Sequence, residues 1–297
     1  MPLHLLESMT DNFSRDRVLG SGVLQNLQHK NIVRLVGFCH ETRRELWSHN
    51  ENRVLATVTR KALCFEFMEN ESLDSHIFDE SSGHDWRTRY AIIKGVCNGL
   101  KYLHEEVKPH MLHLDLKPLN ILLDKKMIPK IADFGLSRFF KEDKSHITIN
   151  NIGTFGYLPP EFIKEKVMSK KLDIFSLGVV IIKIMAGSEG RTRSAEMTSK
   201  KFIENVHGNW RNRLQSAASG DLLESYSEQV KICMEIALSC VEDDRQKRPT
   251  IGDIVNMLTE TETLENYQEE LIDQDFGSLF HTTCHLELQD PDKNDRA

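Results

Sequence analysis

Apolar residues recur every three or four positions between residues 89 and 106, the spacing of an amphipathic helix that buries one face. The repeat is made by Tyr90, Ile93, Val96, Leu100 and Leu103. Between residues 173 and 185, apolar side chains fall on nearly every side of the helix, which is typical of a helix buried in the middle of a domain. The pattern predicts further helices over residues 200–213, 227–240 and 251–260.

Strands are predicted only near the N-terminus. The short apolar runs Ile32–Val36 and Ala62–Met68 have the length of strands, although periodicity alone does not separate a short strand from a buried helical segment. Few strands therefore come first and many helices follow. This order is typical of an α+β fold whose strands are gathered in its N-terminal part.

Composition and charge narrow the classes of function. The 297 residues and an apolar content of 39% allow one large domain or two medium ones. The net charge of −7 is concentrated after residue 261, where ten acidic residues face only Lys293 and Arg296. We expect this acidic stretch to be a solvated, disordered extension. The rest of the chain has no basic face of the kind that binds nucleic acid, so no nucleic-acid partner is expected.

The expected location is cytoplasmic. No stretch reaches the length of about twenty apolar residues that a transmembrane helix needs. The N-terminus lacks the basic start and apolar run of a secretory signal, and the six cysteines form no CxxC pair or metal-binding spacing. We therefore expect reduced thiols in a protein that would reach a membrane only through a partner or a lipid.

Two short motifs carry the candidate chemistry. Residues 113–120 read HLDLKPLN, and residues 133–135 read DFG. Phosphoryl transfer needs a carboxylate that orients the attacking hydroxyl, and oxygen ligands that hold Mg²⁺ against the nucleotide phosphates. Asp115 suits the first need, whereas Asn120 and Asp133 suit the second. Together the two motifs resemble the catalytic loop and the metal-binding loop of protein kinases.

The resemblance continues along the chain. The Lys-Pro step after the aspartate is similar to the serine/threonine class, in which Lys117 would contact the transferring phosphate. Residues 153–161, which read GTFGYLPPE, resemble the substrate-side end of the kinase activation segment. By the same resemblance Glu161 would pair with Arg248, and Asp173 would hold the backbone of the catalytic loop.

Residues 31–39 and 85–104 resemble plant receptor-like kinases in particular. The resemblance implies a protein-kinase-like fold. Its N-lobe and hinge would comprise residues 1–68 and its helical C-lobe residues 69–261, and the acidic tail would comprise residues 262–297.

ATP and Mg²⁺ are the cofactors that the resemblance implies, and the implied partner is a protein substrate or a signalling protein. Backbone groups of Glu66 and Met68 would bind the adenine, and Leu122 would form the floor beneath it. Gly20 and Gly22 correspond to the first glycines of the loop that covers the phosphates, GxGxxGxV.

The family pattern breaks after Gly22. The next residues, Val23–Leu27, resemble the end of a helix that normally lies two strands further on. Roughly thirty to forty residues of the pattern are absent, including the lysine that grips ATP and its helical glutamate partner. Lys30 and Lys61 lie nearby, but neither lies in a strand with the alternation of the family's lysine strand. The resemblance therefore implies a truncated N-lobe and impaired or lost catalysis.

Other interpretations stay open. Because Asp115, Lys117, Asn120 and Asp133 are all present, the chain could be an active serine/threonine kinase. It could also be a non-catalytic pseudokinase that binds partners, or a fragment of a disrupted gene, and the junction could come from sequence assembly or splicing. Leu114 stands where many kinases have an arginine that pairs with a phosphorylated activation segment. This so-called non-RD pattern predicts that such phosphorylation is not the main switch.

Overall fold

The computed structural model describes residues 27–49, 52–77, 84–139 and 153–261. The predicted phosphate-loop residues Gly20 and Gly22 lie outside the described residues, as do the junction that follows Gly22 and the acidic tail.

The two helices with the strongest apolar patterns are confirmed. Helix α3, Trp86–Lys101, is capped at its start by Asp85, whose side chain accepts a hydrogen bond from the Thr88 amide at 2.8 Å. It continues as the π-helical turn Tyr102–Glu106. Helix α5, Lys170–Ala186, is buried along almost its whole length. It packs against helix α8, Gly220–Cys240, and forms the centre of the main apolar core.

Further helices complete the helical part. They are α4 (Pro160–Glu165), α6 (Gly190–Glu196), α7 (Ser199–Leu214) and a last helix over residues 251–261. The predicted range of α8 was too short at its start, because Leu222 and Leu223 pack partly buried against the core and Tyr226 is buried in it. Such tertiary contacts extend a helix beyond the segment in which the apolar spacing is regular.

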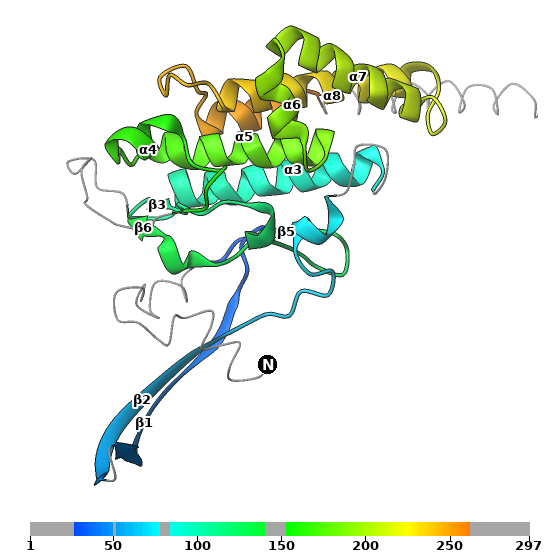
Figure 1. The fold of residues 1–297 in the computed structure, drawn as a ribbon. Coiled ribbons are helices and arrows are strands. Elements are labelled where there is room, and N and C mark those ends of the chain that lie inside the picture. Colours follow the sequence, from blue (N-terminus) through cyan, green and yellow to red (C-terminus); the bar gives the residue numbers. More distant parts are fainter. Residues whose placement is uncertain (1–26, 50–51, 78–83, 140–152, 262–297) are drawn as a thin grey trace, which may run out of the picture.

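The predicted strands were wrong in extent. Strand β1, Leu35–His49, and strand β2, Asn52–Phe65, form one long antiparallel hairpin, which projects away from the helices (Figure 1). Ile32 lies outside β1 and makes only an isolated parallel bridge to Ile131. The two strands contain polar residues along much of their length, so no continuous apolar run in the sequence predicted the hairpin.

Short strand pairs line the border between the hairpin and the helices. Strand β4, Ile121–Leu123, pairs with β5, Pro129–Ile131, and strand β3, Met111–Leu112, pairs with β6, Arg138–Phe139. The mixed helix and strand content agrees with the predicted α+β class. No helix within the described ranges is both long and apolar enough to cross a membrane.

Helix α3 lies unusually close to the segments that precede the hairpin and form β5. A Cβ atom added to Gly99 would come within 2.7 Å of the Asn31 carbonyl oxygen, and one added to Gly95 within 2.5 Å of the Pro129 side chain. Asn31 also donates its side-chain amide to the Pro129 carbonyl at 2.8 Å. These contacts anchor the base of the hairpin to the helical part.

Candidate active site

The Asp115 carboxylate lies at the centre of a short hydrogen-bond network. Lys117 Nζ donates to Asp115 Oδ2 at 2.8 Å, and the Thr154 hydroxyl donates to Asp115 Oδ1 at 2.7 Å. Lys117 Nζ also donates to Thr154 Oγ1 at 2.8 Å, so the three side chains form a closed triangle. The Asn120 side-chain amide donates to Asp115 Oδ2 at 3.1 Å and to the Asp115 carbonyl at 2.9 Å. Three of the predicted site residues are thus brought together on one loop.

Asp173, in the first turn of α5, holds this loop from beneath. Its fully buried carboxylate accepts from the backbone amides of His113 and Leu114, each at 2.8 Å, and His104 Nε2 lies 2.8 Å from Asp173 Oδ2. Burial by itself raises the pKa of the Asp173 carboxyl. The hydrogen bond from His104 and the charges of His104 and His113 outweigh burial, so the pKa is below its ordinary value.

A small apolar cluster packs the same loop against residues 162–172. It consists of the buried side chains of Leu112, Leu114, Phe162, Met168 and Leu172, and it is separate from the main core. Leu114 is completely buried at a backbone φ of 70°, a conformation that non-glycine residues adopt rarely. The position where an arginine is common in the family is therefore occupied by a core side chain.

Asp133 lies close to Asn120 because the backbone of the preceding residue, Ala132, is hydrogen-bonded to the backbone of Asn120. The Ala132 amide donates to the Asn120 carbonyl at 2.8 Å, and His113 Nε2 lies 2.9 Å from the Ala132 carbonyl. Phe134 is buried against the His113 ring, with ring centroids 5.5 Å apart. The Asp133 side chain is exposed, and its Oδ1 accepts from the Gly135 amide at 3.2 Å.

The donor set at Asn120 and Asp133 fits Mg²⁺ bound together with nucleotide phosphates. Mg²⁺ prefers oxygen ligands and is commonly held by one or two carboxylates plus substrate phosphates. Because the amide nitrogen of Asn120 donates to Asp115, the amide oxygen is the atom left for a cation. No group of three or more histidine, cysteine, aspartate or glutamate side chains suited to a metal occurs in the described part of the chain. Nucleotide phosphates and water would complete the coordination.

The predicted adenine-binding residues lie at the base of the hairpin. Glu66 follows β2 directly, its amide donates to the Arg34 carbonyl at 3.0 Å, and Met68 is buried. Leu122, the predicted floor, is half-buried in β4 and is the register partner of Lys130 in β5.

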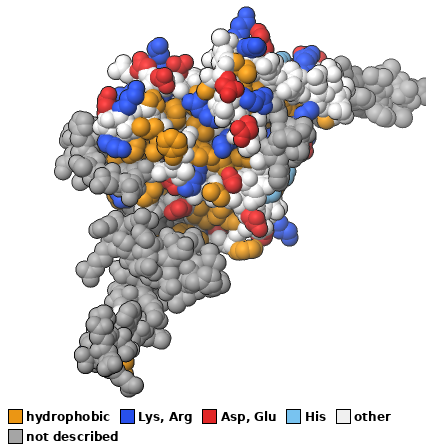
Figure 2. Space-filling model, in the orientation of Figure 1, with side chains coloured by type: hydrophobic (Ala, Val, Ile, Leu, Met, Phe, Trp, Pro, Cys, Tyr) orange, Lys and Arg blue, Asp and Glu red, His pale blue; other side chains and the backbone are white. Residues whose placement is uncertain are grey.

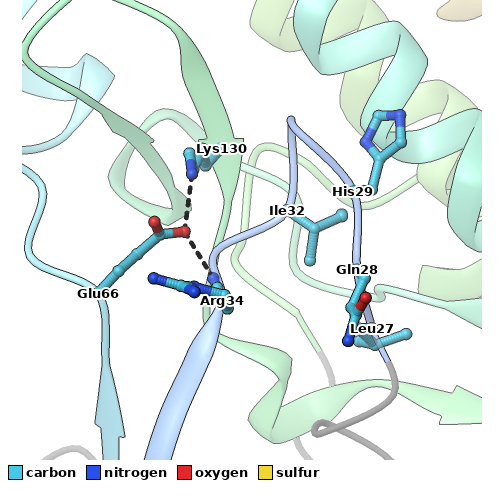
Figure 3. Close-up of a pocket in the computed structure, with 7 residues that line it drawn as sticks. All are labelled: Leu27, Gln28, His29, Ile32, Arg34, Glu66 and Lys130. Atoms are coloured by element: carbon cyan, nitrogen blue, oxygen red, sulfur yellow. Dashed lines mark hydrogen bonds and ion pairs between the residues drawn. The ribbon is translucent and has the colours of Figure 1, made fainter.

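The side chain of Glu66 has a structural role that the sequence did not indicate. Its Oε1 forms an ion pair with Lys130 Nζ at 2.8 Å and accepts from the Arg34 amide at 2.8 Å (Figure 3). Partial burial raises the pKa of Glu66, but the Lys130 and Arg34 contacts outweigh it and lower the pKa. This side chain thus joins the segment after β2 to Arg34, just before β1, and to β5.

A cavity of about 260 Å³ adjoins this ion pair, and both residues of the pair belong to its lining (Figure 3). Its lining is formed by Leu27, Gln28, His29, Ile32, Arg34, Glu66 and Lys130. Only Glu66 is shared with the predicted nucleotide-binding residues, and none of the residues around Asp115 lines the cavity. The cavity is therefore separate from the candidate chemistry.

Two further contacts concern residues 153–161. The predicted pair is present: Arg248 donates to both Glu161 oxygens, at 2.7 and 2.8 Å, and its guanidinium is buried. The Thr154 hydroxyl, in the same segment, contacts both Asp115 and Lys117. Only its place in the GTFGYLPPE motif could have suggested this contact.

Comparisons with known proteins agree with the motifs. A family model described as protein kinase domain matches residues 12–258. Cysteine-rich receptor-like protein kinase 5 of Arabidopsis thaliana is 39% identical over 247 residues, which are 80% of this chain and 34% of that protein. The G-type lectin S-receptor-like serine/threonine-protein kinase SD1-13 of the same plant is 34% identical over 242 residues, 80% of this chain and 27% of that protein. The chain thus spans about a third of the length of the curated relatives it matches.

Proposed function

Because this chain belongs to the protein kinase family, we propose that its catalytic loop is organised for ATP-dependent phosphoryl transfer to a serine or threonine hydroxyl of a protein. The observation that carries the proposal is the network in which Lys117, Asn120 and Thr154 fix both oxygens of the Asp115 carboxylate. A carboxylate held in one orientation is what the attacking hydroxyl requires.

Each side chain of the network has a distinct proposed role. Asp115 Oδ1, which accepts the Thr154 hydroxyl, would accept the proton of the substrate hydroxyl. Lys117 would place its positive charge beside the phosphate in transfer, at the cost of one of its present hydrogen bonds. Bound Mg²⁺ would neutralise the nucleotide phosphates. Asn120 and Asp133 would supply protein oxygens to it.

We further propose that the N-lobe is truncated and that catalysis is impaired. The support is the break in the family pattern after Gly22, which removes the lysine that grips ATP. Lys130 is paired with Glu66, which directly follows β2, and not with a glutamate on a helix as in the family pattern. Loss of one preorganised contact to a transition state typically lowers the rate by ~10²–10³. Residues that act as a unit do not give additive losses, so we expect residual transfer close to background.

A partner-binding role is the second candidate, and the hairpin favours it. Leu46 and Leu55 are register partners near its end, and they are 69% and 57% exposed. Within the described residues β1 and β2 pair only with each other, so both outer edges of the ribbon are without a strand neighbour there. Open strand edges and exposed apolar pairs are features through which proteins associate.

The remaining organisation is proposed on the same basis. We place the boundary between the two lobes after Met68, where β2 has ended and the chain enters the helical part. A cytoplasmic location and a protein substrate or signalling partner remain predictions. A transcript that runs on without an insert across codons 22 and 23 would exclude an assembly or splicing artefact.

The test is transfer of labelled phosphate from Mg·ATP to the chain itself and to a generic protein substrate. Asp115→Asn is the variant, and Asp221→Asn, an exposed aspartate on α8, is the matched control. We expect transfer near background in all three proteins, with folding verified by circular dichroism. Substantial transfer that is lost only in Asp115→Asn would overturn impaired catalysis and establish an active kinase. Failure to bind Mg·ATP at millimolar concentration would leave the partner-binding role.

A further inference from the structure

Two histidines from separate segments form a pair at the start of α3. His76 ends the short 3-10 turn Leu73–His76, and His84 lies two residues before the helix. His84 Nε2 lies 2.9 Å from His76 Nδ1, and the ring centroids are 5.0 Å apart. In the space-filling view, histidine side chains reach the surface along the right-hand edge of the helical part, the side on which α3 begins (Figures 1 and 2). The proposed phosphoryl transfer uses neither ring.

A backbone contact fixes the position of the proton on His76. Its Nε2 lies 2.9 Å from the Asn70 carbonyl oxygen. Because a carbonyl oxygen only accepts, Nε2 carries a proton, and Nδ1 of the neutral ring carries a lone pair. Histidines that bind metals almost always donate their second ring N–H to a carbonyl, a carboxylate or water in this way. His76 therefore already has the orientation of a metal ligand, and its lone pair faces His84.

The backbone of His84 is held against the core. Arg89 Nε donates to the His84 carbonyl at 3.0 Å, and Arg89 Nη1 donates to the Ile184 carbonyl in α5. The Arg89 guanidinium is directed over the Trp210 ring, 5.0 Å from its centroid. These contacts fix the starting point of the His84 side chain while both imidazoles remain half-buried and within reach of solvent.

The charge state of His84 suits a metal ligand. Burial lowers the pKa of His84, the charges of His76 and Arg89 lower it further, and Asp85 opposes them. The pKa is below its ordinary value, so the ring is neutral at pH 7, as metal binding requires. To bind through Nε2, His84 must carry its proton on Nδ1, and this exchange with water leaves the ring neutral.

The separation of the two nitrogens matches a shared metal ion. With bonds of about 2.0–2.1 Å, two nitrogens on one metal lie roughly 2.9–3.4 Å apart, from right-angle to tetrahedral geometry. The observed 2.9 Å is within this range, so the rings would have to turn toward a common point but not to move apart. Imidazole nitrogens suit Ni²⁺, Cu²⁺ and Zn²⁺, whereas Mg²⁺ prefers oxygen ligands.

We infer that His76 and His84 form a binding site for a divalent transition metal ion such as Ni²⁺, Cu²⁺ or Zn²⁺, which links the turn Leu73–His76 to the start of α3. Within the described ranges, no larger group of histidine, cysteine, aspartate or glutamate suited to a metal surrounds them, so water completes the coordination. The site is independent of the proposed function, because the Mg²⁺ ligands proposed there are oxygens of Asn120 and Asp133.

Titration of Ni²⁺ into the untagged, EDTA-treated full chain, followed by calorimetry, tests the site. We expect His76→Gln and His84→Gln each to weaken Ni²⁺ binding at this site by about tenfold or more, because each removes one of its two protein ligands. Both rings are half-buried, so the variants are expected to fold, and circular dichroism verifies this. Ni²⁺ binding that is unchanged in either variant would overturn the inference.

Two controls separate this site from other metal-binding groups. His207→Gln on α7 removes a half-buried histidine whose ring contacts the Ser227 hydroxyl at 2.8 Å, and it should keep the affinity for Ni²⁺. Asp133→Asn alters the proposed Mg²⁺ site and should also keep it. A loss in either control that equals the loss in His76→Gln would contradict the assignment, as would displacement of Ni²⁺ by a millimolar excess of Mg²⁺.

Spectroscopy counts the ligands directly. With one equivalent of Cu²⁺, electron paramagnetic resonance of the unaltered chain should show coupling to two imidazole nitrogens. His76→Gln and His84→Gln should each remove at least one of them. Coupling to fewer than two nitrogens in the unaltered chain would show that the two histidines are only hydrogen-bonded to each other and would reject the site.

Discussion

The catalytic loop and the β1–β2 hairpin differ sharply in how they are held. The loop is fixed by the buried carboxylate of Asp173, by a small apolar cluster and by side-chain hydrogen bonds around Asp115. The hairpin is held mainly by pairing between its own two strands, and Leu46 and Leu55 near its end remain exposed. The residues proposed for proton and metal chemistry therefore belong to the part of the molecule with the large core.

This difference divides the proposed site into a nucleotide-binding part and a part that carries out phosphoryl transfer. The adenine-binding residues lie where the hairpin joins the core, and Glu66 makes that connection through Lys130. The geometry around Asp115 depends on α5 and the small cluster instead. Substitutions in the two regions should therefore have very different consequences.

The largest effect is expected for Asp173→Ala. The substitution leaves the buried amides of His113 and Leu114 without their acceptor, and it removes the partner of His104. Removal of one partner from a buried charged network typically costs about 3–5 kcal/mol. Urea unfolding should show the loss, while Asp221→Ala on α8 should change little. A similar stability for both variants would mean that the loop is not held from beneath.

The next largest effect is expected for Leu114→Ala. It leaves a cavity in the small apolar cluster next to the catalytic loop. Large-to-small substitutions at buried leucines cost about 2–5 kcal/mol. The matched control is Leu46→Ala on the hairpin, where the side chain is exposed. Thermal unfolding of the two variants side by side measures the difference, and equal midpoints would refute the role of the cluster.

Acid should destabilise the catalytic loop. The pKa of Asp173 is lower in the folded chain than in the unfolded chain, so its contribution to stability is complete above the unfolded value of about 3.9 and is lost as the pH falls below it. Hydrogen exchange of the His113 and Leu114 amides between pH 5 and pH 3 should report this loss. Asp173→Asn should flatten the dependence. Protection that stays constant across this range would contradict it.

The smallest effect is expected at the far part of the hairpin. Leu46→Ser and Leu55→Ser change exposed side chains, and such substitutions usually alter stability by less than about 0.5 kcal/mol. Urea unfolding of the double variant is the measurement. A loss of several kcal/mol would show that the hairpin is an integral part of the core and would remove the contrast between the two regions.

The sequence by itself determined the features that depend on local spacing. The apolar repeat predicted α3 and the continuous apolar stretch predicted α5, because helical periodicity is written into neighbouring residues. The motifs around Asp115 and Asp133 identified the candidate chemistry because each motif consists of consecutive residues. The break after Gly22 is likewise a property of the sequence, and its consequence for catalysis remains a prediction.

Only the tertiary structure decided the contacts between residues far apart in the chain. The hydrogen bond from Thr154 to Asp115 joins positions 39 residues apart, and the Glu66–Lys130 ion pair joins positions 64 residues apart. No local sequence pattern predicts such pairs. The sequence did not predict the length of the hairpin because its two strands contain many polar residues and no long apolar run. Local periodicity fixes which elements form, whereas packing fixes which of their side chains meet.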